Sequence, residues 1–252
     1  MSELIDVERE GHAARVRFLR TDKHNAFNRA LSDAVMDALA MLEMDADVHC
    51  VVLTGSGGAF SAGADMSEAV AAIDNAGRSE GMGATIARAA RFPKPIIAAV
   101  NGICYGGGAL LAISCDIRIA SEDAAFRFPG ASYGLVVGGA QLPRVIGAAH
   151  AKELLFTGRV VRADEALRIG LVNRVVPRDE IDSAAMALAA EIAANSPEAL
   201  VATKEVVERA VEADDAFTRE AAWNAKLRQS PEHHARFRAA ADRVTRRPPA
   251  PN

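Results

Sequence analysis

The chain has 252 residues, and its 29 Lys and Arg residues against 33 Asp and Glu residues give a formal net charge of −4. A chain of this length can fold without a disulfide or metal, and its composition, 50% hydrophobic and 25% charged, excludes disorder over most of its length. The acidic balance argues against a nucleic-acid-binding protein, and no apolar run reaches the roughly 20 residues of a transmembrane helix.

The N-terminus and the cysteines indicate the cellular compartment. The opening segment, MSELIDVEREG, has no apolar run of the kind that a signal peptide carries. Cys50, Cys104 and Cys115 are odd in number and form no CxxC pair, which favours reduced core thiols. We therefore expect a cytoplasmic protein. The adjacent His233 and His234 lack the spacing of a zinc site, so we expect no metal.

The first half of the chain predicts strands and helices in alternation. Short strands at 5–8 and 14–19 flank a turn. Asn28 is the expected N-cap of a helix whose apolar face carries Leu31, Val35, Leu39 and Leu42. A buried strand at 48–54 ends in glycines, and segment 66–90 is helical in composition but interrupted by glycines. A buried strand at 96–100 follows, and glycines 106–108 start a helix at 109–114.

The second half predicts a change of character after residue 177. A strand at 117–120, helices at 138–156 and 163–169, and a strand at 171–176 complete the alternation, which is typical of a parallel α/β core. From residue 179 onward we predict helices only, at 181–195, 197–213, 215–228 and 231–244. Residues 245–252 are expected to form a disordered tail.

Two glycine motifs partly match known motifs, a dinucleotide-binding fingerprint and the nucleophile elbow of hydrolases. The first follows the strand at 48–54, but Phe60 replaces its third glycine, so it is no dinucleotide fingerprint. The second, Gly130-Ala-Ser132-Tyr-Gly134, matches the GxSxG nucleophile elbow of hydrolases. Pro129 before it is a poor substitute for the strand that this elbow needs. A nucleophilic Ser132 remains the third hypothesis.

The remaining glycine signal is a pair of strand-to-helix junctions, AFSAGAD at 59–65 and NGICYGGG at 101–108. Backbone N–H groups at a helix start have no intrahelical partner, and small residues allow a ligand to approach them. Two such groups that converge on one carbonyl oxygen form an oxyanion hole, which would stabilise an enolate or a tetrahedral intermediate.

With these two junctions, the sequence resembles the crotonase family, also called the enoyl-CoA hydratase/isomerase family. Five ordered motifs carry the resemblance. They are Arg20…Asn25-Ala26-Phe27, AFSAGADM at 59–66, PKPIIAAVNGICYGGG at 93–108, CDIRIA at 115–120, and the segment from Thr157-Gly158 to Gly170-Leu171-Val172. The resemblance implies a β-β-α spiral core, here residues 1–195, and a C-terminal helical trimerisation region, here 196–244. It also implies a homotrimer or hexamer.

The resemblance further implies an acyl-CoA thioester ligand, with coenzyme A as part of the substrate and no separate cofactor. By motif position, the oxyanion amides are those of Ala62 and Gly107. The coenzyme A contacts are expected at Lys23, Arg20, Ala62, Ala64 and Asp65, and the acyl pocket at Tyr105, Leu110, Ser132 and Tyr133. No nucleic acid and no membrane are expected as partners.

The sequence departs from the family at both catalytic glutamates. Hydratases of the family carry one in GGGxE and the other in a QPE-like segment, to activate water and to handle the proton at the α-carbon. Here these positions are Leu110 and Gly130. Glu68 and Glu80 are weak candidates for a replacement. We expect an enzyme that acts through an enolate-type intermediate with a non-standard acid or base. The alternative is a non-catalytic acyl-CoA-binding or carrier protein of the same fold.

Overall fold

The computed structural model describes residues 3–68, 81–133, 135 and 137–212. The chain divides into two compact units, Met1–Ala194 and Asn195–Asn252, and the described helix of the second unit is α8, Pro197–Glu212. The predicted helices at 215–228 and 231–244 and the predicted tail at 245–252 lie outside the described residues. Among the described residues, no helix is long and apolar enough to cross a bilayer.

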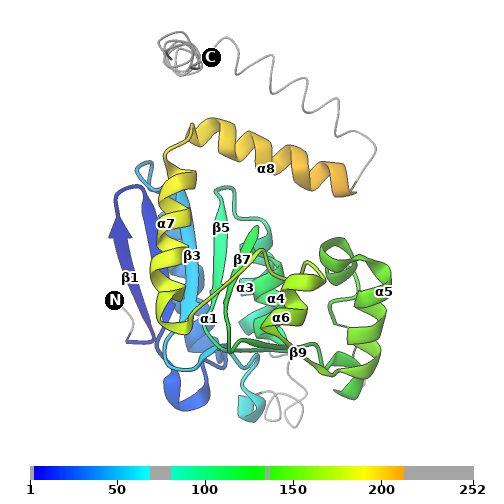
Figure 1. The fold of residues 1–252 in the computed structure, drawn as a ribbon. Coiled ribbons are helices and arrows are strands. Elements are labelled where there is room, and N and C mark those ends of the chain that lie inside the picture. Colours follow the sequence, from blue (N-terminus) through cyan, green and yellow to red (C-terminus); the bar gives the residue numbers. More distant parts are fainter. Residues whose placement is uncertain (1–2, 69–80, 134, 136, 213–252) are drawn as a thin grey trace, which may run out of the picture. The chain divides into compact units, whose positions relative to one another are not determined.

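A six-stranded sheet forms the centre of the first unit (Figure 1). Its strands, in the order in which they pair, are β1 (Ile5–Glu10), β2 (Ala13–Phe18), β3 (Cys50–Gly55), β5 (Ile96–Val100), β7 (Ile117–Ser121) and β10 (Arg174–Val176). The hairpin of β1 and β2 is antiparallel, and the other neighbouring pairs of this sheet are parallel. The parallel α/β core predicted from the alternation of elements is therefore confirmed.

The central strands of this sheet are buried on both faces, because successive side chains point to opposite sides of a strand. In β3, Val51 and Leu53 belong to a core cluster that includes the apolar face of α1 (Arg29–Met44). Cys50 and Val52 pack on the other face, in a cluster that includes α7 (Ile181–Ala193). Figure 1 shows α7 running along the sheet beside β3. Burial on both faces explains why these strands are almost continuously apolar.

Helix α1 begins where the sequence predicts it. The side chain of Asn28 accepts a hydrogen bond from the Leu31 N–H at 2.9 Å, as an N-cap does. The predicted apolar face is buried, including Val35, Leu39 and Leu42. The other described helices of this unit are α3 (Gly81–Ala90), α4 (Gly107–Ile113), α5 (Leu142–Thr157) and α6 (Ala163–Arg168), with short 3-10 helices η1 (Thr21–Lys23), η2 (Gly130–Tyr133) and η3 (Arg178–Glu180).

A second, four-stranded sheet is absent from the sequence-based prediction. Its strands, in pairing order, are β4 (Ala59–Ser61), β6 (Ile103–Tyr105), β8 (Ala125–Arg127) and β9 (Val160–Arg162). Each has three residues, which is too short for an alternating pattern to be recognised. Strands β4, β6 and β8 directly follow β3, β5 and β7, so each of these three long strands is succeeded by a short one. Strands β4 and β6 lie within the two glycine-rich junctions.

Two predicted elements differ in extent from the observed ones. The strand predicted at 171–176 is only β10, Arg174–Val176, because the N–H groups of Leu171 and Val172 donate to the Ala166 carbonyl instead of a strand. The helix predicted at 138–156 begins at Leu142, and Gly147, with φ 75° and ψ 161°, interrupts its helical backbone. In the segment predicted as helical at 66–90, the structure has helix α3 at its C-terminal end. Residues 69–80 of this segment lie outside the described part.

Candidate functional site

The two glycine-rich junctions lie against each other. Strands β4 and β6 are parallel neighbours, with Ser61 opposite Cys104, so the residues that follow them emerge at the same edge of the small sheet. A Cβ atom on Gly63 would lie only 3.0 Å from the Gly107 nitrogen. Gly63 has a φ of 100°, a conformation that favours glycine, so both its backbone and its surroundings exclude a side chain.

The Ala64 amide faces away from the segment that holds it. The Phe27 N–H donates to the Gly63 carbonyl at 2.7 Å, and the Asp65 N–H donates to the Phe27 carbonyl at 2.9 Å. These bonds form a parallel bridge between Phe27 and Ala64, in which the N–H of Ala64 itself points to the opposite side. Ala64 is exposed, and no atom of the described residues accepts its N–H.

The Ala62 amide, which the sequence assigns to the oxyanion hole, is already engaged. Its N–H donates to the His24 carbonyl at 2.9 Å, so it is not available to a ligand in this structure. The next amide, of Gly63, donates to the Ser61 hydroxyl at 3.1 Å. The Ala62 amide therefore does not fit the role that the sequence predicts for it, whereas the Ala64 amide has no acceptor among the described residues. No sequence signal distinguishes these two alanines, because the choice depends on which N–H the His24 carbonyl accepts.

The Gly107 amide stands at the first position of α4. The preceding Gly106 is the N-cap and makes no side-chain cap, and its carbonyl accepts the first helical hydrogen bond, from the Leu110 N–H at 3.1 Å. The N–H of Gly107 therefore lacks an intrahelical partner. Met82 of α3 packs on Gly107, since a Cβ atom there would collide with its sulfur. This junction thus offers an amide beside an apolar wall.

Asp65 is an ionised structural carboxylate next to the first junction. Its Oδ2 lies 2.6 Å from the Arg20 Nη1, and its Oδ1 accepts the Ser67 N–H at 2.9 Å. The hydrogen bond from Arg20 lowers the pKa of Asp65 below its ordinary value, against the opposing effect of burial. A carboxylate held in this form is a poor proton donor. Asp65 therefore anchors the loop that carries Ala64.

The predicted coenzyme A contacts occupy different environments. Arg20 bonds to Asp65 and also donates to the Ala26 carbonyl at 2.9 Å, so it ties the entry segment to the loop. Lys23, in η1, is exposed beside that segment. Both assignments stay predictions. Of the two cations, Lys23 could contact a phosphate without loss of the Arg20 bonds to Asp65 and Ala26.

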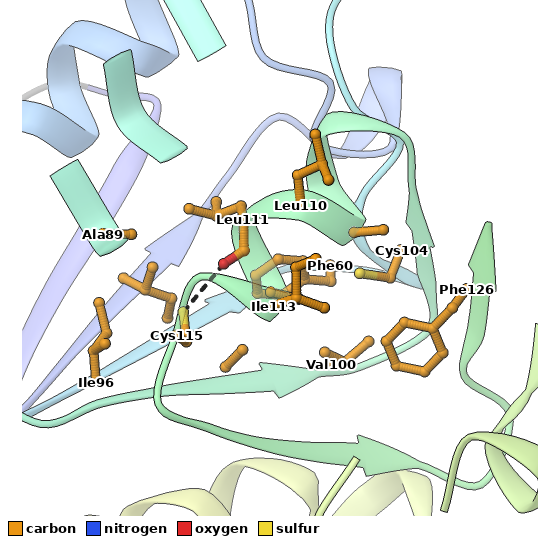
Figure 2. Close-up of a cluster of buried hydrophobic side chains, with 14 of the residues drawn as sticks. Phe60, Ala89, Ile96, Val100, Cys104, Leu110, Leu111, Ile113, Cys115 and Phe126 are labelled. Atoms are coloured by element: carbon orange, nitrogen blue, oxygen red, sulfur yellow. Dashed lines mark hydrogen bonds between the residues drawn. The ribbon is translucent and has the colours of Figure 1, made fainter. Parts of the chain in front are cut away.

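Apolar groups stand at positions 110 and 130, where the resemblance predicts the glutamates of family hydratases. Figure 2 shows Leu110 leaving α4 in a different direction from Leu111, on the outer side of the labelled cluster. A Cβ atom on Gly138 would lie 3.1 Å from the Leu110 Cδ2. Gly130 is buried, and a Cβ atom there would lie 3.0 Å from the Val137 Cβ. A carboxylate at position 130 would therefore have to displace Val137.

Of the two replacement carboxylates named from the sequence, the structure describes Glu68, and it is engaged at the start of α1. Both oxygens of Glu68 accept the Arg29 N–H, at 3.0 and 3.3 Å, at the start of α1. This contact gives Glu68 a capping role in this structure. Glu80 lies outside the described residues. Neither residue has a described contact with Ala64 or Gly107.

The predicted acyl-pocket residues other than Leu110 are spread over two elements. Tyr105 is half-buried at the end of β6, immediately before the second junction. Ser132 and Tyr133 are exposed on η2. Ser132 stands in a 3-10 helix rather than in the strand-to-helix turn of a nucleophile elbow, and no described histidine bonds to it. The structure therefore gives the Ser132 nucleophile no support.

The cysteines are buried and form no disulfide, and burial raises the pKa of the Cys104 thiol well above its ordinary value. A thiol of this kind is a poor nucleophile. Within the described part of the chain, no three or more His, Cys, Asp or Glu residues gather in a way that could hold a metal ion. The two junction amides remain the groups best arranged for chemistry.

Comparison with known proteins agrees with this arrangement. Residues 8–250 match the family described as Enoyl-CoA hydratase/isomerase. The chain is 40% identical over 216 residues to the short-chain-enoyl-CoA hydratase of Clostridium acetobutylicum, with 83% of each chain covered. It is 38% identical over 216 residues to the human mitochondrial Delta(3,5)-Delta(2,4)-dienoyl-CoA isomerase, covering 77% of this chain and 64% of the isomerase.

Among solved structures, the crystal structure of an enoyl-CoA hydratase from Bacillus anthracis matches with a TM-score of 0.90 and 31% identity. The match covers 96% of this chain and 97% of that one. The family match, residues 8–250, spans both glycine-rich junctions. The chain therefore belongs to the enoyl-CoA hydratase/isomerase, or crotonase, family.

Proposed function

We propose that the protein binds an acyl-CoA thioester with its carbonyl oxygen between the N–H groups of Ala64 and Gly107. The observation that carries the proposal is the contact of the two junctions, in which the Cβ position of Gly63 lies 3.0 Å from the Gly107 nitrogen. Both amides lack an acceptor among the described residues. Family membership supports the thioester as the ligand class.

The proposed reaction class is one in which negative charge develops on the thioester oxygen, because a pair of backbone amides can stabilise that charge. Negative charge that develops on a thioester oxygen, as in an enolate, is stabilised by fixed N–H dipoles in a site sheltered from water. We propose hydratase or isomerase chemistry through such an intermediate. Leu110 and Gly130 supply no carboxylate, so the acid or base would differ from the family's glutamates. The apolar contacts at these positions favour the second candidate, a non-catalytic acyl-CoA binder.

Calorimetric titration with octanoyl-CoA, octanoate and free coenzyme A tests the ligand assignment. We expect octanoyl-CoA to bind much more tightly than octanoate, since the proposed site holds a thioester oxygen rather than a carboxylate. It should also bind more tightly than coenzyme A alone, which lacks the acyl carbonyl. Equal affinity for octanoyl-CoA and octanoate, or no binding of octanoyl-CoA, would exclude the proposed ligand.

A proline at position 64 tests the amide itself. Ala64→Pro removes the N–H that we assign to the oxyanion hole, and this N–H makes no described bond within the protein. Ala64→Gly keeps the N–H and is the matched control. We expect the proline variant to bind octanoyl-CoA up to about tenfold more weakly, since it loses one hydrogen bond to the thioester oxygen, worth about 1 kcal/mol. Circular dichroism should show that both variants remain folded. Unchanged affinity in a folded proline variant would contradict the assignment.

We also propose a cytoplasmic location. The three cysteines are thiols buried in the core rather than disulfides, which suits a reducing compartment. Fractionation of cells that express the tagged protein would test this proposal.

A further inference from the structure

Ser61 carries a buried hydroxyl that joins two backbone segments beside the candidate site, the entry segment at Asn25 and the loop at Gly63. The residue closes strand β4, and its side chain is fully buried. Its hydroxyl donates to the Asn25 carbonyl at 2.8 Å and accepts the Gly63 N–H at 3.1 Å. Both hydrogen-bonding roles of this hydroxyl are thus used by the backbone. The two bonds hold the loop that leads to Ala64 against the entry segment.

The acceptor of the Ser61 hydroxyl is itself fixed. Asn25 is fully buried and has a φ of 54°, in the left-handed region. Its side-chain Nδ2 donates to the Ala59 carbonyl at 2.7 Å and to the Ser56 carbonyl at 3.0 Å. Ser61 is therefore bonded to a rigid support rather than to a free loop.

The bond to Gly63 determines where the Ala64 amide points. The N–H of Ala64 and the carbonyl of Gly63 belong to one planar trans peptide, so they point in opposite directions. The Phe27 N–H holds that carbonyl at 2.7 Å, and the Ser61 hydroxyl holds the preceding amide at 3.1 Å. With both sides of Gly63 fixed, the Ala64 N–H has one available direction.

Ser61 also touches the second junction. A Cβ atom on Gly108 would lie 2.3 Å from the Ser61 carbonyl oxygen and 2.8 Å from the Ser61 Cβ, so the first turn of α4 rests on this residue. Gly107 begins that turn. Through its hydroxyl and its backbone, Ser61 contacts both segments that carry the proposed amides.

We propose that Ser61 is a positioning residue that sets the Ala64 amide relative to the Gly107 amide. The inference rests on the proposed function, because it concerns the same oxyanion hole. Ser61 does not touch the thioester. Removing its hydroxyl leaves the Gly63 N–H and the Asn25 carbonyl without their bonds, so the loop relaxes and the donor at residue 64 moves away from the oxygen it should face.

The experiment measures the hydrogen bonding of the thioester carbonyl through its stretching frequency. Octanoyl-CoA labelled with ¹³C at its carbonyl is bound to the full chain, and isotope-edited infrared difference spectra give the carbonyl stretching frequency. Hydrogen bonds from the two amides lower this frequency relative to free octanoyl-CoA. We expect Ser61→Ala to lose about half of that lowering and to bind several-fold more weakly, because one of the two donors moves away from the carbonyl oxygen.

Thr54→Val is the matched control. Thr54 is also fully buried, and its hydroxyl donates to the Ala99 carbonyl at 3.0 Å within the large sheet. Its removal destabilises the fold in the same way as the loss of Ser61, but it should leave the carbonyl frequency and the affinity unchanged. An effect of Thr54→Val equal to that of Ser61→Ala would show that general destabilisation moves the amide, and it would overturn the inference.

Ser61→Cys decides the question if Ser61→Ala does not fold. A thiol is larger than a hydroxyl and is a weaker donor and acceptor, but it fills the site that the alanine variant leaves empty. This variant should therefore lower the carbonyl frequency less than the parent does and more than the alanine variant. Full lowering in either folded Ser61 variant would overturn the positioning role alone. If the parent itself fails to bind octanoyl-CoA with a lowered frequency, the proposed function fails, and this inference fails with it.

Discussion

Asp65 and Arg20 form an ion pair whose effect on stability depends on pH. The side chains are 10% and 17% exposed, respectively, and the pKa of Asp65 is lowered by Arg20. A carboxyl group with a lowered pKa stabilises the fold above its unfolded pKa of about 3.9, and this stabilisation is lost as the pH falls through the folded value. Asp65→Asn should therefore reduce the free energy of unfolding by about 2 kcal/mol at neutral pH. The difference from the parent should shrink below about pH 4, as urea denaturation at several pH values would show.

The control for this prediction is the ion pair of Arg29 and Asp33. Its atoms are 3.6 Å apart, and both side chains are mostly exposed, so solvent screens their attraction. Asp33→Asn should change the free energy of unfolding little at any pH. A loss in the Asp65 variant that stays constant from neutral pH to below pH 4 would refute the assigned role of its charge.

The residues at positions 110 and 130, where the resemblance predicts glutamates, lead to a prediction about turnover. Leu110 and Gly130 cannot exchange protons, and one well-placed acid or base contributes about 10²–10⁴ in rate. The parent protein should hydrate crotonyl-CoA slower, by at least this factor, than a family member that carries both glutamates. A spectrophotometric assay at saturating crotonyl-CoA measures the rate. Ordinary turnover would contradict the prediction, and Glu68→Gln and Glu80→Gln would then identify the unrecognised base.

Neither of the two positions would readily accept a glutamate, and the obstacle is different at each. The Cβ position of Gly130 is crowded by Val137, so Gly130→Glu requires the segment around residue 137 to move. Leu110→Glu would place a carboxylate among apolar neighbours, where an unpaired charge is costly. Restoration of hydratase activity by both changes together is therefore not expected, and the assay of the parent carries the test.

At the scale of elements, helix α1 depends on its N-cap. Asn28 bonds to the Leu31 N–H, and α1 supplies a large share of the core on one face of the sheet. Asn28→Ala should reduce the free energy of unfolding by about 1 kcal/mol, whereas Asn28→Asp and Asn28→Ser should retain most of it, because their oxygens can accept the same bond. Chemical denaturation of the three variants measures this ranking. An alanine variant as stable as the aspartate variant would contradict the capping role.

The elements that could be predicted are those with a long pattern or a defined cap. Helix α1 had an apolar face and Asn28, and β3 and β5 had continuous apolar runs, so their positions followed from the sequence. The three-residue strands of the small sheet had neither feature. They are strands because they pair with one another, and such pairing between segments far apart in the sequence leaves no local pattern.

At the scale of the whole molecule, the sequence predicted which two segments form the candidate site but not which amide of the first segment lacks an acceptor. Five ordered motifs located the two junctions, and the structure brings them together at Gly63 and Gly107. The Ala62 amide does not fit its predicted role, since its N–H is engaged by a contact with His24, a segment far away in the sequence. The importance of Ser61 was hidden for the same reason, because its partners include Asn25.

The assembly of the molecule can be tested through α8. We predict a homotrimer or hexamer that depends on the C-terminal helical region, and α8 carries Val207 and Val211, exposed and one helical turn apart on one face. The double variant Val207→Lys, Val211→Lys should dissociate to monomers in light scattering, because two buried charges cannot be accommodated in an apolar interface. The control is Met41→Lys, Met44→Lys on α1. These two exposed apolar residues lie outside the C-terminal region, so their substitution should leave the oligomer intact. A parent that is monomeric at micromolar concentration, or an α8 variant that stays oligomeric, would show that the assembly does not depend on this helix.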